Sequence, residues 1–177
     1  MAGTLTVQNI QGPASGANAN KIIIPSGQTL DIDAWTPPAG TVLQVVHSVT
    51  NFEATISEGV GTSATGFYIN ITPISAASSI LIAVAGGRVR TNGTGIGAIV
   101  LTLRRNGSVI NDSNSVRIGG VDADQFPVSL NVLDSSHNTT SLIRYELYAN
   151  TVELTGNTNI NNSTSQNISF TAMEISG

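Results

Sequence analysis

The stretch GFYINITPISAASSILIAVA, residues 66–85, contains two apolar segments of different kinds. In residues 67–71, Phe and Ile alternate with Tyr and Asn, which is the period-two pattern of a strand with one buried face. In residues 79–85, nearly every position is apolar, which is typical of a strand with both faces covered. Pro73 lies between the segments and predicts a loop there, because proline cannot donate to a strand ladder.

The amino-acid composition indicates β-strands in the rest of the chain as well. Ile, Val and Thr number 19, 15 and 20, so 54 of the 177 residues are β-branched and suit a pleated, half-buried surface. No window of a dozen residues has sustained apolar spacing of three and four, so helix should be nearly absent. We expect an all-β protein with strands at 41–51, 66–72, 79–85, 95–105, 108–111, 128–133, 142–150, 152–154 and 167–175.

Two local patterns sharpen the prediction. Asn106-Gly107 favours a two-residue hairpin turn, since both residues tolerate a positive φ. In residues 142–150, alternation predicts that Ile143 and every second residue after it face inward. The polar stretch 155–166 is interpreted as a long connection. Eight to ten short strands with polar turns favour a jelly-roll-like β-sandwich, which limits exposed sheet edges.

The first forty residues differ from the rest. Short apolar pieces separated by Gly, Pro and Asn cannot close a core of their own, although Pro25 and Gly27 favour a turn. We therefore predict an N-terminal extended β arm or short shaft at residues 1–40 and a sandwich head at 41–177. The residues expected to pack the arm against another surface are Ile22, Ile24, Leu30, Ile32 and Trp35.

The net charge of the chain argues against nucleic acid as a partner, and the short apolar runs argue against a membrane. Seven Lys and Arg against 11 Asp and Glu give a net charge of −4, so we expect no nucleic-acid binding. The longest apolar runs, 22–24 and 80–87, fall far short of the roughly 18–20 residues of a spanning helix. No membrane insertion is expected. The chain has no cysteine, which removes disulfides, thiolate zinc sites and cysteine nucleophiles.

Catalytic and metal sites have weak sequence support. His47 lies within a predicted strand without a partner and is interpreted as a surface or structural residue. His137 lies beside Asp134 and Ser136, but these residues are too close in sequence to favour a serine–histidine–aspartate relay, so a polar turn is preferred. The acid pairs 31/33 and 122/124 lack a calcium-loop pattern. We expect no catalytic residue, no cofactor and no metal.

Several phrases resemble one family. NITPISAASSILIAVAGG (70–87), LRRNGSVI (103–110), LDSSHNTTSLIRYELYA (133–149) and ISFTAMEI (168–175) are similar to the head domain of structural proteins of tailed bacteriophages, especially cyanophages and other marine phages. The opening at residues 3–32 is similar to the N-terminal arms of phage fibre proteins. The resemblance implies a non-enzymatic virion component of the tail-fibre or receptor-binding type, assembled in the bacterial host cytoplasm.

The same resemblance implies a set of partners: two further copies in a homotrimer, other virion proteins through the arm, and a host surface glycan or protein. A capsid decoration or cement protein is the alternative, with its arm lying across neighbouring capsid subunits. A lectin module is a third class, for which Trp35 is the conspicuous sugar-stacking candidate. We expect Trp35 to anchor the arm to the head instead.

Overall fold

The structure is a computed structural model of the 177-residue chain. It describes residues 12–17, 19, 21–27, 36–57, 59, 61–92, 97–110, 115–120, 125–153, 157–161 and 166–177. The chain divides into two compact units, Met1–Thr36 and Pro37–Gly177. The described part of the chain contains no helix.

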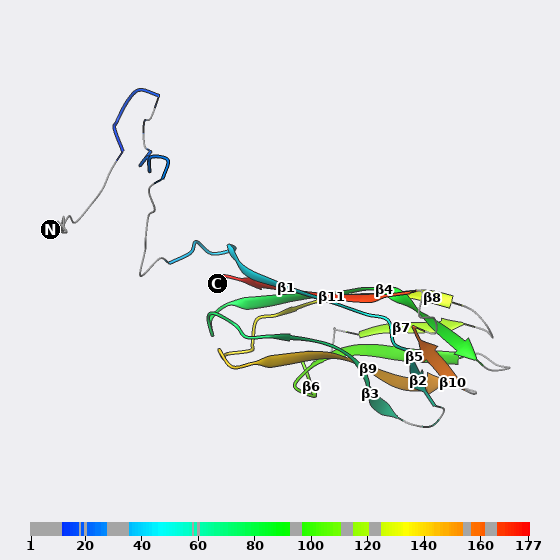
Figure 1. The fold of residues 1–177 in the computed structure, drawn as a ribbon. Helices are drawn as coiled ribbons and strands as arrows, with labels where there is room; N and C mark the ends of the chain where they lie inside the picture. The colour runs from blue at the N-terminus through cyan, green and yellow to red at the C-terminus, as the bar shows by residue number, and fades with distance from the viewer. Residues whose placement is uncertain are drawn as a thin grey trace. The chain divides into compact units, whose positions relative to one another are not determined.

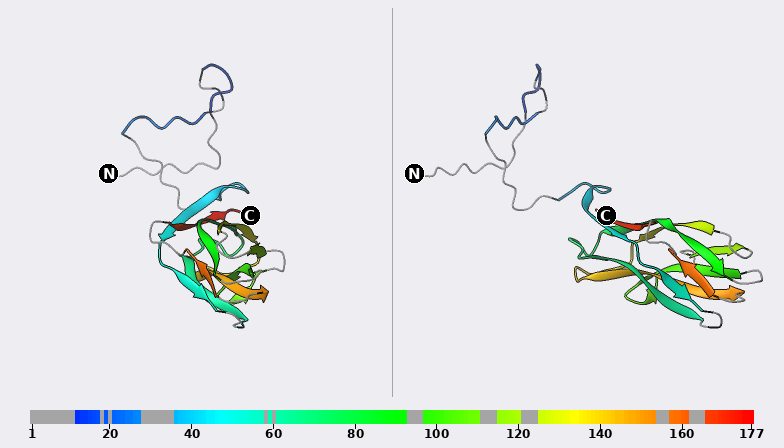
Figure 2. Two further views of the ribbon diagram at one scale, coloured as in Figure 1. Left: turned by 90° about the vertical axis from the view of Figure 1, so that its right-hand side faces the viewer. Right: turned by 45° about the vertical axis from the view of Figure 1, so that its right-hand side comes forward.

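The described residues of the second unit form eleven strands, all paired antiparallel. Their bounds are β1 Val42–Thr50, β2 Ala54–Ile56, β3 Thr62–Ile71, β4 Ser79–Asn92, β5 Gly97–Arg105, β6 Ser108–Val109, β7 Ser115–Gly120, β8 Gln125–Asp134, β9 Ile143–Glu153, β10 Asn157–Ile160 and β11 Ile168–Ile175. Figures 1 and 2 show them as two layers that face each other.

The order of the strands identifies the architecture. The first sheet has the order β1-β11-β4-β10-β2, with β8 on the other side of β4. The second has the order β3-β9-β5-β6, with β7 also pairing with β5. When the short strands β2, β6 and β10 are set aside, the remaining strands fall in the orders first, eighth, third, sixth and second, seventh, fourth, fifth. This is the order of a jelly roll, so the predicted all-β jelly-roll-like sandwich is confirmed.

The core lies between the two layers and follows the predicted alternation. Phe67, Ile69 and Ile71 of β3 are buried. On β9, Ile143 and the alternate residues Tyr145, Leu147 and Ala149 are fully buried. Full burial of a Leu, Ile or Phe side chain contributes about 1.5–3 kcal/mol. Inward alternation from both sheets therefore holds the sandwich together.

One expectation about β4 is wrong for the single chain. Ile80, Ile82 and Val84 face the core, but Leu81 and Ala83 are only half-buried and Ala85 is exposed. The apolar run was expected to be covered on both faces, whereas this chain covers one of them. The other face of β4 is the outer surface of the first sheet.

The strands differ from the prediction in several places: β2 and β7 correspond to no predicted strand, and β9 runs without a break to Glu153, where two strands were expected. Residues 157–160, interpreted as part of a long connection, form β10, which pairs with β2 and with the end of β4. Strand β4 continues to Asn92 past an irregularity between Gly86 and Val89. Asn106 and Gly107 have φ of 49° and 83°, as the predicted hairpin turn requires.

The first unit is described in part. Ser26 and Gly27 form a turn, and Gly27 has a φ of 82°, which agrees with the predicted turn. Residues 21–25 form no strand pairing, and Ile22, Ile23 and Ile24 are 57%, 56% and 40% exposed. Leu30, Ile32 and Trp35 lie outside the described residues.

Candidate functional site

Two buried carboxylates organise one end of the head. Glu174 lies near the end of β11 and Asp134 ends β8, and both are inaccessible to solvent. The chain also enters the head at this end, since the Gly40 N–H donates to Ser176 O at 2.8 Å and Ser176 N–H donates to Thr41 O at 2.8 Å. We refer to the two acids and the groups that bond to them as the carboxylate cluster.

Glu174 holds the loop between β3 and β4. Its carboxylate accepts hydrogen bonds from Ser78 Oγ at 2.6 Å, from Gln44 Nε2 at 2.6 Å and from the N–H groups of Ile74 and Ser75 at 2.9 Å. Burial raises the pKa of Glu174, but these hydrogen bonds outweigh it, so the pKa lies below its ordinary value. The acid is therefore charged at neutral pH and ties three segments together.

Asp134 holds the next loop in the same way. It forms an ion pair with Arg105 Nη1 at 2.9 Å and accepts from the Tyr145 hydroxyl at 2.7 Å and from Ser136 N–H at 3.0 Å. Although burial raises the pKa of Asp134, these partners keep it below the ordinary value. Burial, and then the hydrogen bond to Asp134, raise the pKa of Tyr145, which stays protonated and donates.

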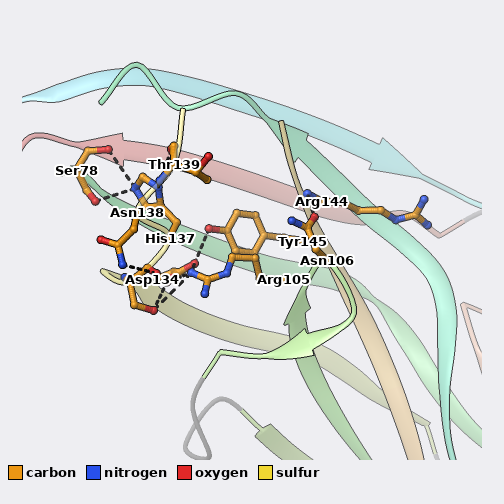
Figure 3. Close-up of polar contacts among 10 residues, drawn as sticks. Ser78, Arg105, Asn106, Asp134, His137, Asn138, Thr139, Arg144 and Tyr145 are labelled. Atoms are coloured by element: carbon orange, nitrogen blue, oxygen red, sulfur yellow. Dashed lines mark hydrogen bonds and ion pairs between the residues drawn. The ribbon is translucent and has the colours of Figure 1, made fainter. Parts of the chain in front are cut away.

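His137 bridges the two loops. Its ring nitrogens lie 2.8 Å from the Ser78 carbonyl oxygen and 3.0 Å from the Thr139 carbonyl oxygen (Figure 3). Ser78 Oγ lies 3.3 Å from His137 Nε2, but the hydroxyl donates to Glu174. Asp134 bonds to Arg105, Tyr145 and Ser136 instead of to the imidazole.

This arrangement is not that of a nucleophilic relay. A relay needs the acid on the far side of the histidine from the serine, so that the histidine takes the serine proton. Here Glu174 bonds directly to Ser78, and both side chains are buried, as is His137. The cluster holds loops in place. His137 lies in the loop where a polar turn is predicted. The roles of Ser78 and Glu174 could not be predicted, because the two residues come from segments far from His137 in the chain.

The outer face of the second sheet is charged and internally paired. The Arg144 guanidinium lies 3.7 Å from the centre of the Tyr68 ring and donates to Glu146 at 3.0 Å. The Arg104 guanidinium lies 4.6 Å from the centre of the Tyr148 ring. Such cation–π contacts contribute about 0.5–1 kcal/mol each at exposed sites. This face presents a stacked Arg and Tyr surface to solvent.

The outer face of the first sheet is different. On β1, Val42, Val45 and Val49 are about half exposed, and His47 is exposed among them. The Nδ1 atom of His47 lies 3.0 Å from Thr171 Oγ1 on β11. The structure thus confirms that His47 lies on a sheet face, far in the chain from the buried His137.

The remaining sequence candidates do not meet in the described structure. The acid pairs at 31/33 and 122/124 lie outside the described residues. Where the structure describes side chains, no group of three or more His, Asp or Glu is placed to hold a metal ion. Within the same residues, no helix long and apolar enough to cross a membrane is present.

Comparison with known proteins gives distant likenesses only. No protein-family model and no curated protein matches the chain. Two solved structures that are similar to it are the infectious bursal disease virus VP2 subviral particle, at 13% identity and a TM-score of 0.44, and the infectious bursal disease virus Gx strain, at 15% and 0.43. The matches cover 93% and 90% of this chain but only 41% and 44% of those viral chains. This chain therefore spans less than half the length of the proteins it matches.

Proposed function

We propose that this chain is a non-enzymatic virion structural protein of a tailed phage, a homotrimeric tail-fibre or receptor-binding component. The proposal is supported by the sequences at 70–87, 103–110, 133–149 and 168–175, which resemble the head domain of structural proteins of tailed bacteriophages. The jelly-roll order of the strands agrees with that resemblance. In this proposal the protein is assembled in the bacterial cytoplasm and resides in the virion.

The observation that carries the proposal is the exposure of Ile22, Ile23 and Ile24. Three consecutive isoleucines are each at least 40% exposed in the single chain. Leaving large apolar side chains in water forgoes about 1.5–3 kcal/mol for each one that could be buried. We propose that this segment, together with Leu30 and Ile32, packs against another virion protein and attaches the head to the particle, while Trp35 anchors the arm to the head.

The head then serves as a rigid platform. Glu174 and Asp134 hold the loops 72–78 and 135–142 at the end where the chain enters the sandwich. A fixed entry point lets the attachment segment and the head act as separate parts of one chain. The exposed surface of the head would meet a host glycan or protein.

The test is attachment to particles that lack the protein. The variant is the full chain with Ile22, Ile23 and Ile24 each replaced by serine, and the control is Ile74→Ser, which changes an isoleucine of the head that is 63% exposed. We expect the triple variant to fold, with an unchanged thermal unfolding midpoint, and to lose most of its attachment. The control should attach as the unmodified chain does.

Two results would count against the proposal. Normal attachment of the triple variant would show that residues 22–24 do not anchor the head. Attachment of several hundred copies across the capsid, instead of at the tail, would favour the decoration or cement protein.

A further inference from the structure

The outer face of the first sheet carries a continuous apolar row. Val45 of β1 pairs with Met173 of β11, Met173 pairs with Leu81 of β4, and Leu81 pairs with Leu133 of β8. The neighbours of these residues along each strand face the core, so the four side chains point outward together. The row crosses all four strands that lie side by side in the upper layer of Figure 1.

The surroundings of the row are also without charge. We define the uncharged face as the outward residues of 42–49, 169–175, 79–85 and 129–133, which include no Lys, Arg, Asp or Glu and, as their one ionisable side chain, His47 beside Thr171. Val45, Val49 and Leu133 are 56%, 51% and 52% exposed, although they lie within regular strands. In the described strands of this sheet, the arginines are Arg88, within the irregularity between Gly86 and Val89, and Arg90, beyond it.

Charge favours a second copy of the chain as the occupant. The chain has a net charge of −4, and a contact through a surface without charge avoids burying like-charged groups against each other. The opposite outer face, with Arg104, Arg144 and Glu146, is charged and already paired within the chain. Of the two outer sheet faces in the described residues, the uncharged face is the one that can meet another copy without setting like charges against each other.

The face supplies about half of the area of a standard subunit contact. Four strands about 4.8 Å apart and seven residues at about 3.4 Å each give a projected area on the order of 450 Å². This is more than half of the roughly 800 Å² per partner that a stable interface buries. The apolar run 79–85 also has the composition of a strand covered on both faces, and a second copy would supply the missing cover.

We infer that the uncharged face of β1, β11, β4 and β8 is the surface through which copies of this chain associate. The inference rests on the proposed homotrimer and assigns its interface. A threefold ring needs a head-to-tail contact, so the β1 side of one uncharged face packs against the β8 side of the next copy's face, and the charged faces of the second sheets point to solvent.

The test compares Val45→Glu and Leu133→Glu with Val109→Glu. Val109 is 46% exposed on β6 of the second sheet, so the control places the same charge on an exposed valine of the other face. Native mass measurement at micromolar concentration should give trimers for the unmodified chain and for Val109→Glu. Val45→Glu and Leu133→Glu should be monomers, with assembly weakened by about 100-fold or more, because each buries an unpaired charge.

A second variant covers the case in which the added charge prevents folding. The chain has no cysteine, so Val45→Cys and Val109→Cys each give a single thiol. In the assembled protein, a bulky maleimide should label Val45→Cys about tenfold more slowly than Val109→Cys. Equal labelling, or trimers formed by both Val45→Glu and Leu133→Glu, would overturn the assigned face and leave the homotrimer standing. A monomeric unmodified chain would overturn both.

Discussion

Replacing Glu174 by glutamine should destabilise the head because it removes one acceptor from a fully satisfied site. The carboxylate accepts from Ser78 Oγ, Gln44 Nε2 and the N–H groups of Ile74 and Ser75, and none of its surface reaches solvent. Gln44 Nε2 also donates to the Thr72 carbonyl at 2.7 Å, so turning the Gln44 amide over would lose that bond.

The expected loss of stability follows from the hydrogen-bond donors around residue 174. Glutamine offers one oxygen and one NH₂ group, so at least one donor around residue 174 would face another donor. A hydrogen bond to a charged group contributes about 1.5–3 kcal/mol, and an unsatisfied buried donor costs about 1–3 kcal/mol. We expect Glu174→Gln to lower the free energy of unfolding by about 2–4 kcal/mol.

Urea and thermal unfolding of the purified full chain measure this change. A loss of that size lowers the unfolding midpoint by about 5–12 °C for a domain of this size. Glu53→Gln is the control, because Glu53 is exposed and its removal should change stability by less than about 0.5 kcal/mol. If the two variants differed by less than about 0.5 kcal/mol, the reasoning that Glu174 holds the loop would be refuted.

Three further expectations concern the same core and cluster. The pKa values of Asp134 and Glu174 lie below their ordinary values of 3.8 and 4.5, so the unfolded chain binds more protons in acid. The stabilisation from these two acids should be fully present near neutral pH, and the free energy of unfolding should fall as the pH drops below about 4.5; an increase there would contradict this. Tyr145→Phe removes the donor 2.7 Å from Asp134 and should cost about 1–2 kcal/mol in urea unfolding, whereas an unchanged stability would show that the bond contributes nothing. Gly87→Ala places a methyl group against the Ile168 side chain at a φ of 59°, so it should cost about 2 kcal/mol or more, and a neutral result would mean that the neighbouring strand moves freely.

The sequence indicates most of the sandwich because alternation is a local signal. Phe67, Ile69 and Ile71 alternate within a few residues, and the alternate residues from Ile143 onward do the same, so their burial could be predicted. The turn at Asn106 and Gly107 could be predicted for the same reason. Strand β10 could not, because its polar residues 157–160 are ordered by pairing with β2 and β4, which lie far away in the chain.

The carboxylate cluster shows the same limit at the level of side chains. Ser78 lies 59 residues before His137 and 96 residues before Glu174, so the three residues come from separate segments of the chain. The local sequence of each residue does not name its partners. Glu174, however, occupies an inward position of its strand, where the alternating pattern predicts an apolar residue. A charged residue at such an inward position is the signal that could have indicated a buried partner.

We propose that this chain is a virion component that is present as trimers. The most direct test is to count its copies in gradient-purified phage particles. Quantitative mass spectrometry against an isotope-labelled standard of this chain gives that number relative to a capsid protein of known copy number. We predict a few tens of copies per particle, in a multiple of three. Absence of the chain from intact particles that are otherwise complete would contradict the proposed function.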